Sequence, residues 1–204
     1  MNTSVAIVGG GLAGLAAAVA LAERGIRIEL FEARKKLGGR AGSYVDRTTG
    51  ERIDHCQHVA MGCCTNYLDF CRRTGTLELF ARHDRLHFFG PDGRRSDLSA
   101  ARWLPPPLHL AGSLVGLKYL SLADKLAIGQ AMLRLMRLKA ADPANEKTVL
   151  AWLRDQRQSQ PAIERFWQVV LVSALGESLD RSSLPAARKV FRDGFLAHRD
   201  AAAL

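Results

Sequence analysis

The sequence predicts an α/β protein, in which a mixed α/β region comes first and a mostly helical region follows. Closely spaced glycines separate a strand-like segment from an Ala- and Leu-rich segment at the start of the chain. Three consecutive prolines occupy 105–107, and nearly every segment after them has helical character. The 204 residues are long enough for one full-sized domain, or for one domain and part of a second. The 48% hydrophobic and 24% charged side chains are ordinary for a globular protein. We therefore divide the chain into regions 1–100 and 101–204.

The first elements are predicted as strand, tight turn, helix and strand. Residues 4–8 are β-branched and apolar, and residues 12–24 are rich in Ala and Leu, with Gly25 placed for a left-handed C-cap. Residues 26–31 alternate apolar and charged side chains with the period of a strand. This order predicts a βαβ unit.

The remaining elements are predicted from turn residues and helix caps. In the first region they are a hairpin over 44–59 that turns at 48–50, a helix over 66–73 that ends at Gly75, and a hairpin that joins 85–89 to 94–98. In the second region they are helices over 122–139 with a capping box of Ser121 and Asp124, over 149–157 after Thr148, after Ser159, and over 184–198 after Ser183.

Gly9, Gly11 and Gly14 form the pattern G-x-G-x-x-G between the first strand and the first helix. In a Rossmann unit the first glycine permits the tight turn, the second lets a pyrophosphate approach the backbone, and the third lets the helix pack on the sheet. Glu32 ends the second strand, where its carboxylate would accept hydrogen bonds from ribose hydroxyls and repel the 2′-phosphate of NADP. A ligand-free glycine turn is the alternative, but three glycines are conformationally costly. We expect a dinucleotide to contact Gly9, Gly11, Leu12, Ala13, Gly14, Glu32 and Ala33.

Arg34, Gly38, Gly39 and Arg40 follow as R-x-x-x-G-G-R. This segment resembles the second fingerprint of the FAD-containing amine oxidase and phytoene desaturase group, which implies that the cofactor is FAD. The resemblance implies that Gly38, Gly39 and Arg40 contact the cofactor and that Arg34 lies near the adenosine.

Further segments resemble one branch of that group, the squalene-associated FAD-dependent desaturases, or hydroxysqualene dehydroxylases. His55 and Cys56 depart from the Asn-Gly usual in that branch, which bears on local geometry and substrate choice. Relatives in the group are longer, so the resemblance implies an N-terminal half: an incomplete FAD-binding region and a truncated helical substrate-binding segment. The segments that carry the resemblance are 54–58, 62–66, 104–110, 164–167, 171–175 and 187–191.

The resemblance implies a reductive reaction on an isoprenoid lipid. Reduced flavin would deliver a hydride to an allylic carbon of hydroxysqualene while the hydroxyl leaves as water, giving squalene. Loss of the hydroxyl needs a proton donor or strong polarisation. We assign the role of donor or polariser to His58, with Asp54 orienting it or positioning Gln57. A structural histidine bonded to a carbonyl is the alternative for His58.

Two other functions remain open. A carotenoid desaturase would run the flavin in the oxidative direction. A non-catalytic fragment or subunit would need a complementary chain to complete the flavin site, because an incomplete sheet leaves an unpaired edge and exposed apolar surface. We expect the chain alone to bind FAD weakly.

The net charge of +9 favours anionic partners. We expect no nucleic acid, because the chain has no zinc-finger spacing and no aromatic RNA-binding motif. The start of the chain has no targeting segment, so a cytoplasmic protein with reduced cysteines is expected. The basic amphipathic stretch 108–139 either contacts the inner membrane face peripherally or covers a substrate cavity, and both can hold. No metal site is expected, because the cysteine spacing fits core positions better.

Overall fold

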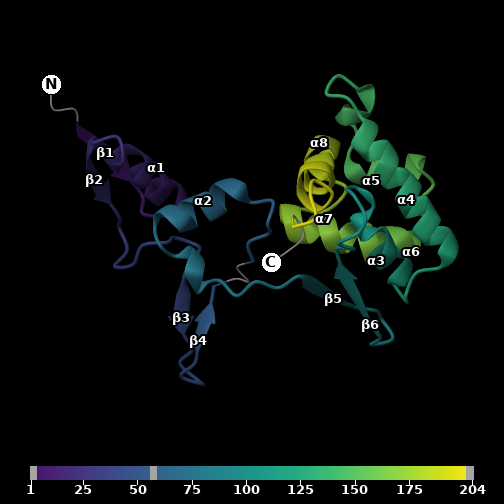
Figure 1. Cartoon of the computed structure of the whole chain (residues 1–204), viewed down its shortest axis with the longest axis horizontal. Coiled ribbons are helices and arrows are strands. Elements are labelled where there is room, and N and C mark those ends of the chain that lie inside the picture. The colour runs from purple at the N-terminus through teal and green to yellow at the C-terminus, as the bar shows by residue number, and fades with distance from the viewer. Residues whose placement is uncertain (1–3, 56–58, 201–204) are drawn as a thin grey trace. The chain divides into compact units, whose positions relative to one another are not determined.

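The computed structural model describes residues 4–55 and 59–200 and contains two compact units (Figure 1). The N-terminal unit comprises the described residues up to Ala60 together with Thr65–Ala81. The C-terminal unit comprises Met61–Cys64 and the described residues from Arg82 onward. The contacts thus divide the chain after Ala81, whereas the sequence placed the boundary at residue 100. The assignment of cofactor and substrate binding to the two regions stays a prediction.

The predicted βαβ unit is confirmed in the N-terminal unit. Two parallel strands pair in register, with Val5 opposite Ile28, and a helix connects them on one side (Figure 1). Gly25 follows the helix with a φ of +73°, which a glycine adopts without strain. The elements are β1 (Ser4–Val8), α1 (Leu12–Ala22) and β2 (Arg27–Phe31).

A short hairpin and a second helix complete the N-terminal unit. The hairpin turns at the predicted position, although its strands are shorter than the pattern suggested. The guanidinium Nε of Arg73 donates to Glu23 Oε1 at 2.8 Å, which ties the end of the second helix to the end of α1. The elements are β3 (Ser43–Val45), β4 (Arg52–Asp54), α2 (Thr65–Arg73) and η1 (Leu77–Leu79).

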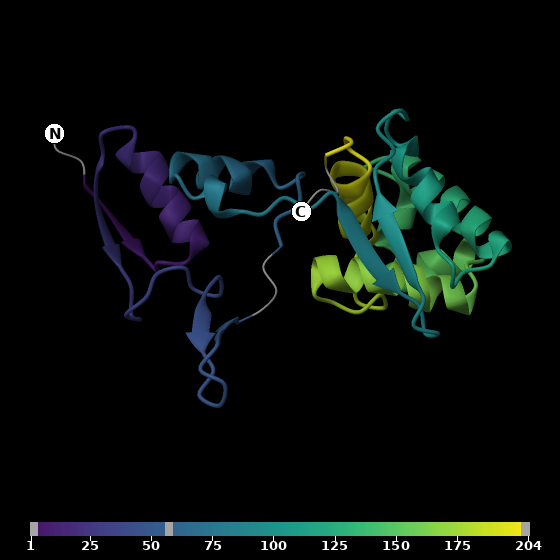
Figure 2. The same ribbon diagram turned by 60° about the horizontal axis from the view of Figure 1, so that its bottom comes forward.

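The C-terminal unit packs a hairpin, β5 (Arg85–Phe89) and β6 (Arg95–Ser99), against helices (Figure 2). Leu98 packs against the helical core, and the Ser113 hydroxyl donates to the Ser99 carbonyl at 2.8 Å. These contacts explain why the hairpin belongs to the helical unit and not to the first one. The helices are η2 (Leu108–Leu110), α3 (Ala111–Gly116), α4 (Leu122–Arg137), η3 (Pro143–Glu146), α5 (Val149–Asp155), α6 (Gln160–Ala162), η4 (Ile163–Trp167), α7 (Gln168–Leu175), α8 (Leu184–Lys189) and η5 (Val190–Phe195).

All four predicted helix caps are present. The Ser121 hydroxyl accepts from the Asp124 amide while the Asp124 carboxylate accepts from the Ser121 amide, which completes the capping box. Thr148, Ser159 and Ser183 each accept from an amide in the first turn of α5, α6 and α8. Two segments expected as α-helix are π-helical, η4 and η5.

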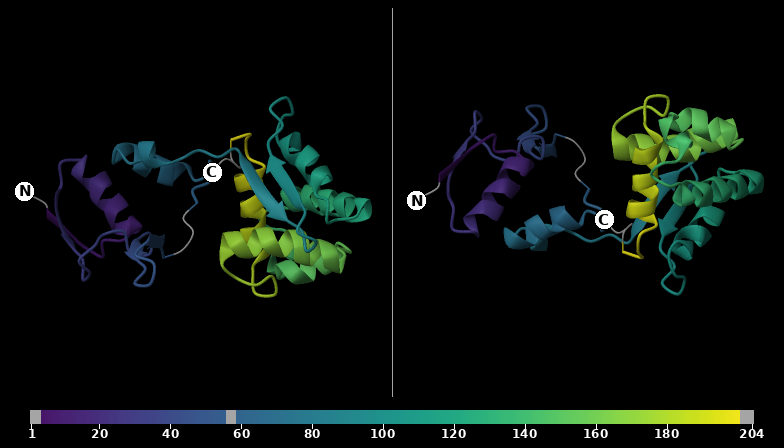
Figure 3. Two further views of the ribbon diagram at one scale, coloured as in Figure 1. Left: turned by 90° about the horizontal axis from the view of Figure 1, so that it is seen from below. Right: turned by 90° about the horizontal axis from the view of Figure 1, so that it is seen from above.

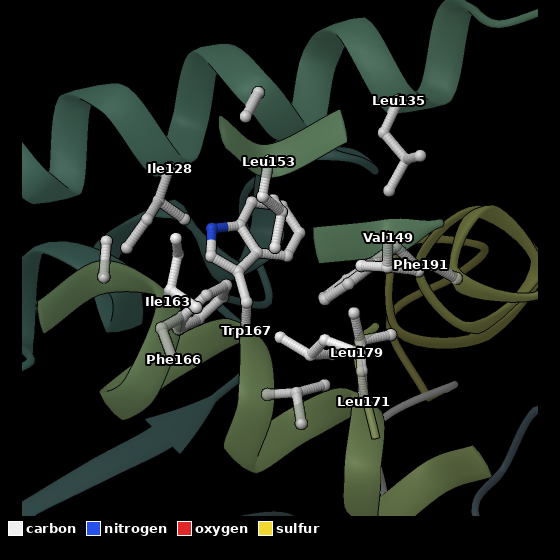
Figure 4. Close-up of a cluster of buried hydrophobic side chains, with 14 of the residues drawn as sticks. Ile128, Leu135, Val149, Leu153, Ile163, Phe166, Trp167, Leu171, Leu179 and Phe191 are labelled. Carbon is white, nitrogen blue, oxygen red and sulfur yellow. The ribbon is translucent and has the colours of Figure 1, made fainter. Parts of the chain in front are cut away.

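The buried core of the C-terminal unit surrounds Trp167, which is fully buried (Figure 4). Its indole packs edge-on against Phe191, with ring centroids 5.2 Å apart. The indole N–H donates to Gln158 Oε1 at 2.9 Å, so the buried polar group has an acceptor. Figure 4 also shows Ile128, Leu153 and Leu171 around the indole, from three different helices.

The N-terminal unit has far less buried apolar surface. Among its described residues, Cys71 alone is a fully buried hydrophobic side chain. Val8, at the end of β1, is 88% exposed, and Phe31 at the end of β2 is also exposed. The β1–β2 sheet has two strands within the described part of the chain, so its outer edges are open to a further strand.

Within residues 4–55 and 59–200, every helix is too short or too polar to cross a lipid bilayer.

Candidate functional site

The turn from β1 into α1 can be built only with glycine at two positions. Gly9 has a φ of +103°, and its N–H donates to the Phe31 carbonyl at 2.7 Å. A Cβ on Gly14 would lie 1.9 Å from the Gly9 carbonyl oxygen and 3.4 Å from a methyl of Ile7. The absence of a side chain at Gly14 therefore mainly allows the turn to close. Its effect on the predicted packing of the helix against the strand is smaller.

Gly11 has a different role, because no internal contact requires it. It is the N-cap of α1 with a φ of −74°, and a Cβ there would meet no heavy atom within 4 Å. The amides of Leu12, Ala13 and Gly14 come next and have no acceptor inside the helix. Because α1 has no acidic side chain in its first turn, the partial positive charge of its N-terminus is available to an anion.

The second glycine motif lies directly against the first. The Gly38 N–H donates to the Gly10 carbonyl at 2.8 Å, and Gly11 and Gly38 form a parallel bridge. Gly39 has a φ of +61°, and a Cβ on it would lie 3.2 Å from the Gly11 Cα. The two motifs, distant in sequence, thus form one side-chain-free backbone surface in front of α1.

Glu32 ties the end of β2 to the first glycine motif. Its Oε2 accepts the Gly10 N–H at 2.7 Å, and its Oε1 accepts the Arg34 N–H at 2.8 Å. The Arg34 and Gly10 amides hold the pKa of this carboxyl below its usual value, so it is ionised at neutral pH. A carboxylate accepts about four hydrogen bonds, which leaves capacity for ribose hydroxyls. That contact stays a prediction, as do those of Ala33, Arg34 and Arg40.

A cavity of about 420 Å³ lies beside the N-terminus of α1, within the size range of ligand sites. Leu12 and residues 41–43, which follow the second glycine motif, form one side. Tyr67 and Phe80 form another, with ring centroids 6.1 Å apart. Nothing in the local sequence marked these two aromatic residues, because only the fold brings α2 and η1 to the glycine motifs.

Asp54 is the candidate catalytic residue that the structure places at this cavity. Its Oδ1 accepts from the Ser43 hydroxyl at 2.6 Å, across the paired ends of β3 and β4. Gln57 and His58 lie outside the described residues, so their roles stay predictions.

Among the described residues, no group of three or more His, Cys, Asp or Glu is arranged to hold a metal ion.

Comparison with known proteins adds evidence on the family. A family model described as an NAD(P)-binding Rossmann-like domain matches residues 7–74, which include both glycine motifs and Glu32. Zeta-carotene desaturase of Synechocystis sp. is 41% identical over 91 residues, 45% of this chain and 18% of that protein. Hydroxysqualene dehydroxylase of Rhodopseudomonas palustris is 37% identical over 88 residues, 43% of this chain and 21% of that protein.

A longer match covers most of the chain. The chloroplastic/chromoplastic zeta-carotene desaturase of Solanum lycopersicum is 27% identical over 177 residues, 81% of this chain and 30% of that protein. The chain therefore spans about a third or less of the length of these relatives.

Two solved structures share the fold. An oxidoreductase from Methanosarcina mazei aligns with a TM-score of 0.65 at 16% identity, over 98% of this chain and 44% of that one. Wild-type putrescine oxidase bound to putrescine aligns with a TM-score of 0.62 at 18% identity, over 91% of this chain and 40% of that one.

The fold and the paired glycine motifs define a Rossmann-like dinucleotide-binding region. The sequence relatives are zeta-carotene desaturases and hydroxysqualene dehydroxylases, and the chain is similar to part of each.

Proposed function

We propose that the protein functions in an FAD-dependent oxidoreductase that acts on an isoprenoid lipid, with the N-terminal unit holding the ADP part of the cofactor. The observation that carries this proposal is the surface formed by Gly11, Gly38 and Gly39 in front of α1. It is free of side chains and lies beside unpaired amides, as a diphosphate needs. Bound FAD would supply two-electron redox chemistry. The protein's own residues would bind and orient it, with Glu32 at the ribose.

We further propose hydroxysqualene as the substrate, converted to squalene, on the strength of the similarity to hydroxysqualene dehydroxylase. In this reaction a C–O bond breaks, a hydride replaces the hydroxyl, and a proton completes the leaving water. His58 would donate that proton, and Asp54 would orient it. Unchanged turnover after His58→Ala in an active longer relative would contradict this assignment.

Carotenoid desaturation is the second candidate, and one observation favours it. The similarity to zeta-carotene desaturase extends over 177 residues and so includes most of the C-terminal unit, whereas the match to hydroxysqualene dehydroxylase covers 88. Product analysis with hydroxysqualene and with carotene precursors separates the two reactions.

A third candidate is a subunit that needs a complementary chain. The open edges of β1 and β2 and the exposed Val8 and Phe31 support it, because a further strand would cover them. A neighbouring reading frame that encodes such a chain would favour this candidate. A flavin site that needs a second chain is also the reason why we expect this chain alone to bind FAD weakly.

Titration with FAD tests the proposal through a single methyl group. Gly11→Ala adds a Cβ that touches nothing in the protein but projects into the proposed diphosphate site, so the variant should fold normally and bind FAD about tenfold more weakly or worse. Circular dichroism checks the fold, and quenching of flavin fluorescence measures binding.

The same methyl group on Gly14 is the matched comparison, because it would clash with the Gly9 carbonyl. Gly14→Ala should therefore perturb the fold as well as binding. Equal FAD affinity of Gly11→Ala and the unmodified chain would overturn the proposal, as would no affinity in either when a complementary chain completes the site.

A further inference from the structure

The β5–β6 hairpin lies against helices of the C-terminal unit (Figure 3). A second cavity is lined by residues of this hairpin and of those helices, all within the C-terminal unit. Its volume is about 160 Å³, and every residue that lines it is apolar. The hairpin contributes Phe88 and Leu98, α4 contributes Met132 and Met136, and η5 contributes Phe191 and Phe195.

The size and lining of this cavity determine what can occupy it. Water needs two to four polar partners, and none of the lining side chains offers one. An apolar protein cavity of about 150 Å³ stays dry and binds benzene. One isoprene unit is similar in size to benzene. The cavity therefore suits the end of a hydrocarbon chain and is too small for a whole C30 isoprenoid.

Gly129 is the smallest of the residues that α4 contributes to the lining of this cavity. It lies in the interior of a 16-residue helix, where glycine is less stable than alanine. A Cβ on Gly129 would meet no heavy atom within 4 Å, and the residue lines the cavity. Alanine or leucine at this position would favour the helix and would place side-chain atoms in the open space beside the cavity.

The lining of the cavity reaches the surface. Leu108 and Leu133 both line it, and they are 52% and 43% exposed. A chain longer than the cavity can therefore keep its end inside and the remainder outside.

We infer that this cavity is a binding site for the apolar, methyl-branched end of a hydrocarbon chain. The inference rests on the proposed function only for the identity of the natural chain, an isoprenoid. The chemistry of the cavity itself is independent of any flavin.

The methionine methyl groups allow a direct test. The chain has four methionines; Met132 and Met136 line the cavity, and Met61 does not. In the full chain with 13C-labelled methionine methyl groups, addition of 2-methyl-2-butene without FAD should shift the Met132 and Met136 signals and leave Met61 unchanged.

Two variants show whether the shifts report occupancy of the cavity. Gly129→Leu should fill it and weaken binding of the hydrocarbon about tenfold or more, and Gly129→Ala should have a smaller effect in the same direction. Gly112→Leu is the control, because Gly112 lies exposed in α3, has open space around it and does not line the cavity.

The inference would be overturned if the Met132 and Met136 signals did not shift on addition of 2-methyl-2-butene. Equal affinity of the Gly129 and Gly112 variants for this hydrocarbon would also overturn it. Because no flavin is present, failure here is distinct from failure of FAD to bind in the Gly11 experiment.

Discussion

His109 is fully buried in the C-terminal unit. Its Nε2 lies 3.1 Å from the Phe195 carbonyl oxygen, and its Nδ1 has no hydrogen-bond partner among the described residues. Burial lowers the pKa of His109 below its ordinary value, since the imidazolium would lose its water, and the nearby Arg199 and His198 act in the same direction. The side chain therefore stabilises the unit only while it is neutral.

We predict a loss of stability on acidification that depends on His109. Above the unfolded-state pKa of about 6.5, both states are neutral and the stability is fully present. As the pH falls through that value, the unfolded chain takes up a proton that the folded chain resists, so the free energy of unfolding decreases until the folded-state pKa is passed.

His109→Gln can still donate to the Phe195 carbonyl but does not titrate. Urea unfolding followed by tryptophan fluorescence reports on this unit, because Trp152 and Trp167 are buried in its core. Between about pH 7.5 and 5.5 the original chain should lose more stability than His109→Gln. Equal losses in both proteins would refute the role of His109.

At the scale of elements, the N-terminus of α4 also anchors a second helix. Besides its bonds to Ser121, Asp124 accepts from the hydroxyl of Ser159, which is the N-cap of α6. The capping box thus holds two helix starts together. The cap of α5 is simpler, since the Thr148 hydroxyl accepts from the Ala151 amide at 3.3 Å and has no reciprocal bond.

Removing these caps should therefore have unequal effects. Ser121→Ala should lower the free energy of unfolding by about 1–2 kcal/mol, and Thr148→Ala by about 0.5 kcal/mol, because the second substitution breaks one long hydrogen bond. Urea denaturation of both variants gives the comparison. A larger loss in Thr148→Ala than in Ser121→Ala would contradict this ranking of the two caps.

The caps show which features the sequence alone predicts. The hydroxyl of each capping residue accepts from the amide three residues further along the chain. Because this pattern is local, the sequence predicts all four caps. The paired glycines of the N-terminal unit were found for the same reason. The π-helical turns η4 and η5 and the lining of both cavities depend on contacts between distant elements. No short-range pattern could reveal that Tyr67 and Phe80 border the glycine motifs, or that Gly129 lines a cavity.

The whole molecule combines a net charge of +9 with exposed apolar residues on its longest described helix. On α4, Ile128 and Leu135 are buried in the core, and the helix also lines the apolar cavity. The expectation that 108–139 covers a substrate cavity stays a prediction. Leu122, Leu126 and Leu133 are exposed at helical spacing. Such a face can enter the headgroup region of a bilayer, and the positive charge would favour anionic lipid.

We therefore predict that the protein co-sediments with vesicles containing phosphatidylserine and is released by high salt, because screening weakens the attraction between the chain and the anionic surface. Leu126→Gln should weaken this binding roughly tenfold, since a buried leucine contributes about 1.5–3 kcal/mol. The matched control is Leu79→Gln in the N-terminal unit, where the side chain is 82% exposed against 60% for Leu126. If both substitutions weaken vesicle binding equally, exposed leucines contribute wherever they lie, and α4 is not the specific site of membrane contact. If salt does not release the protein, the net charge does not contribute, and the apolar face alone would have to account for any binding.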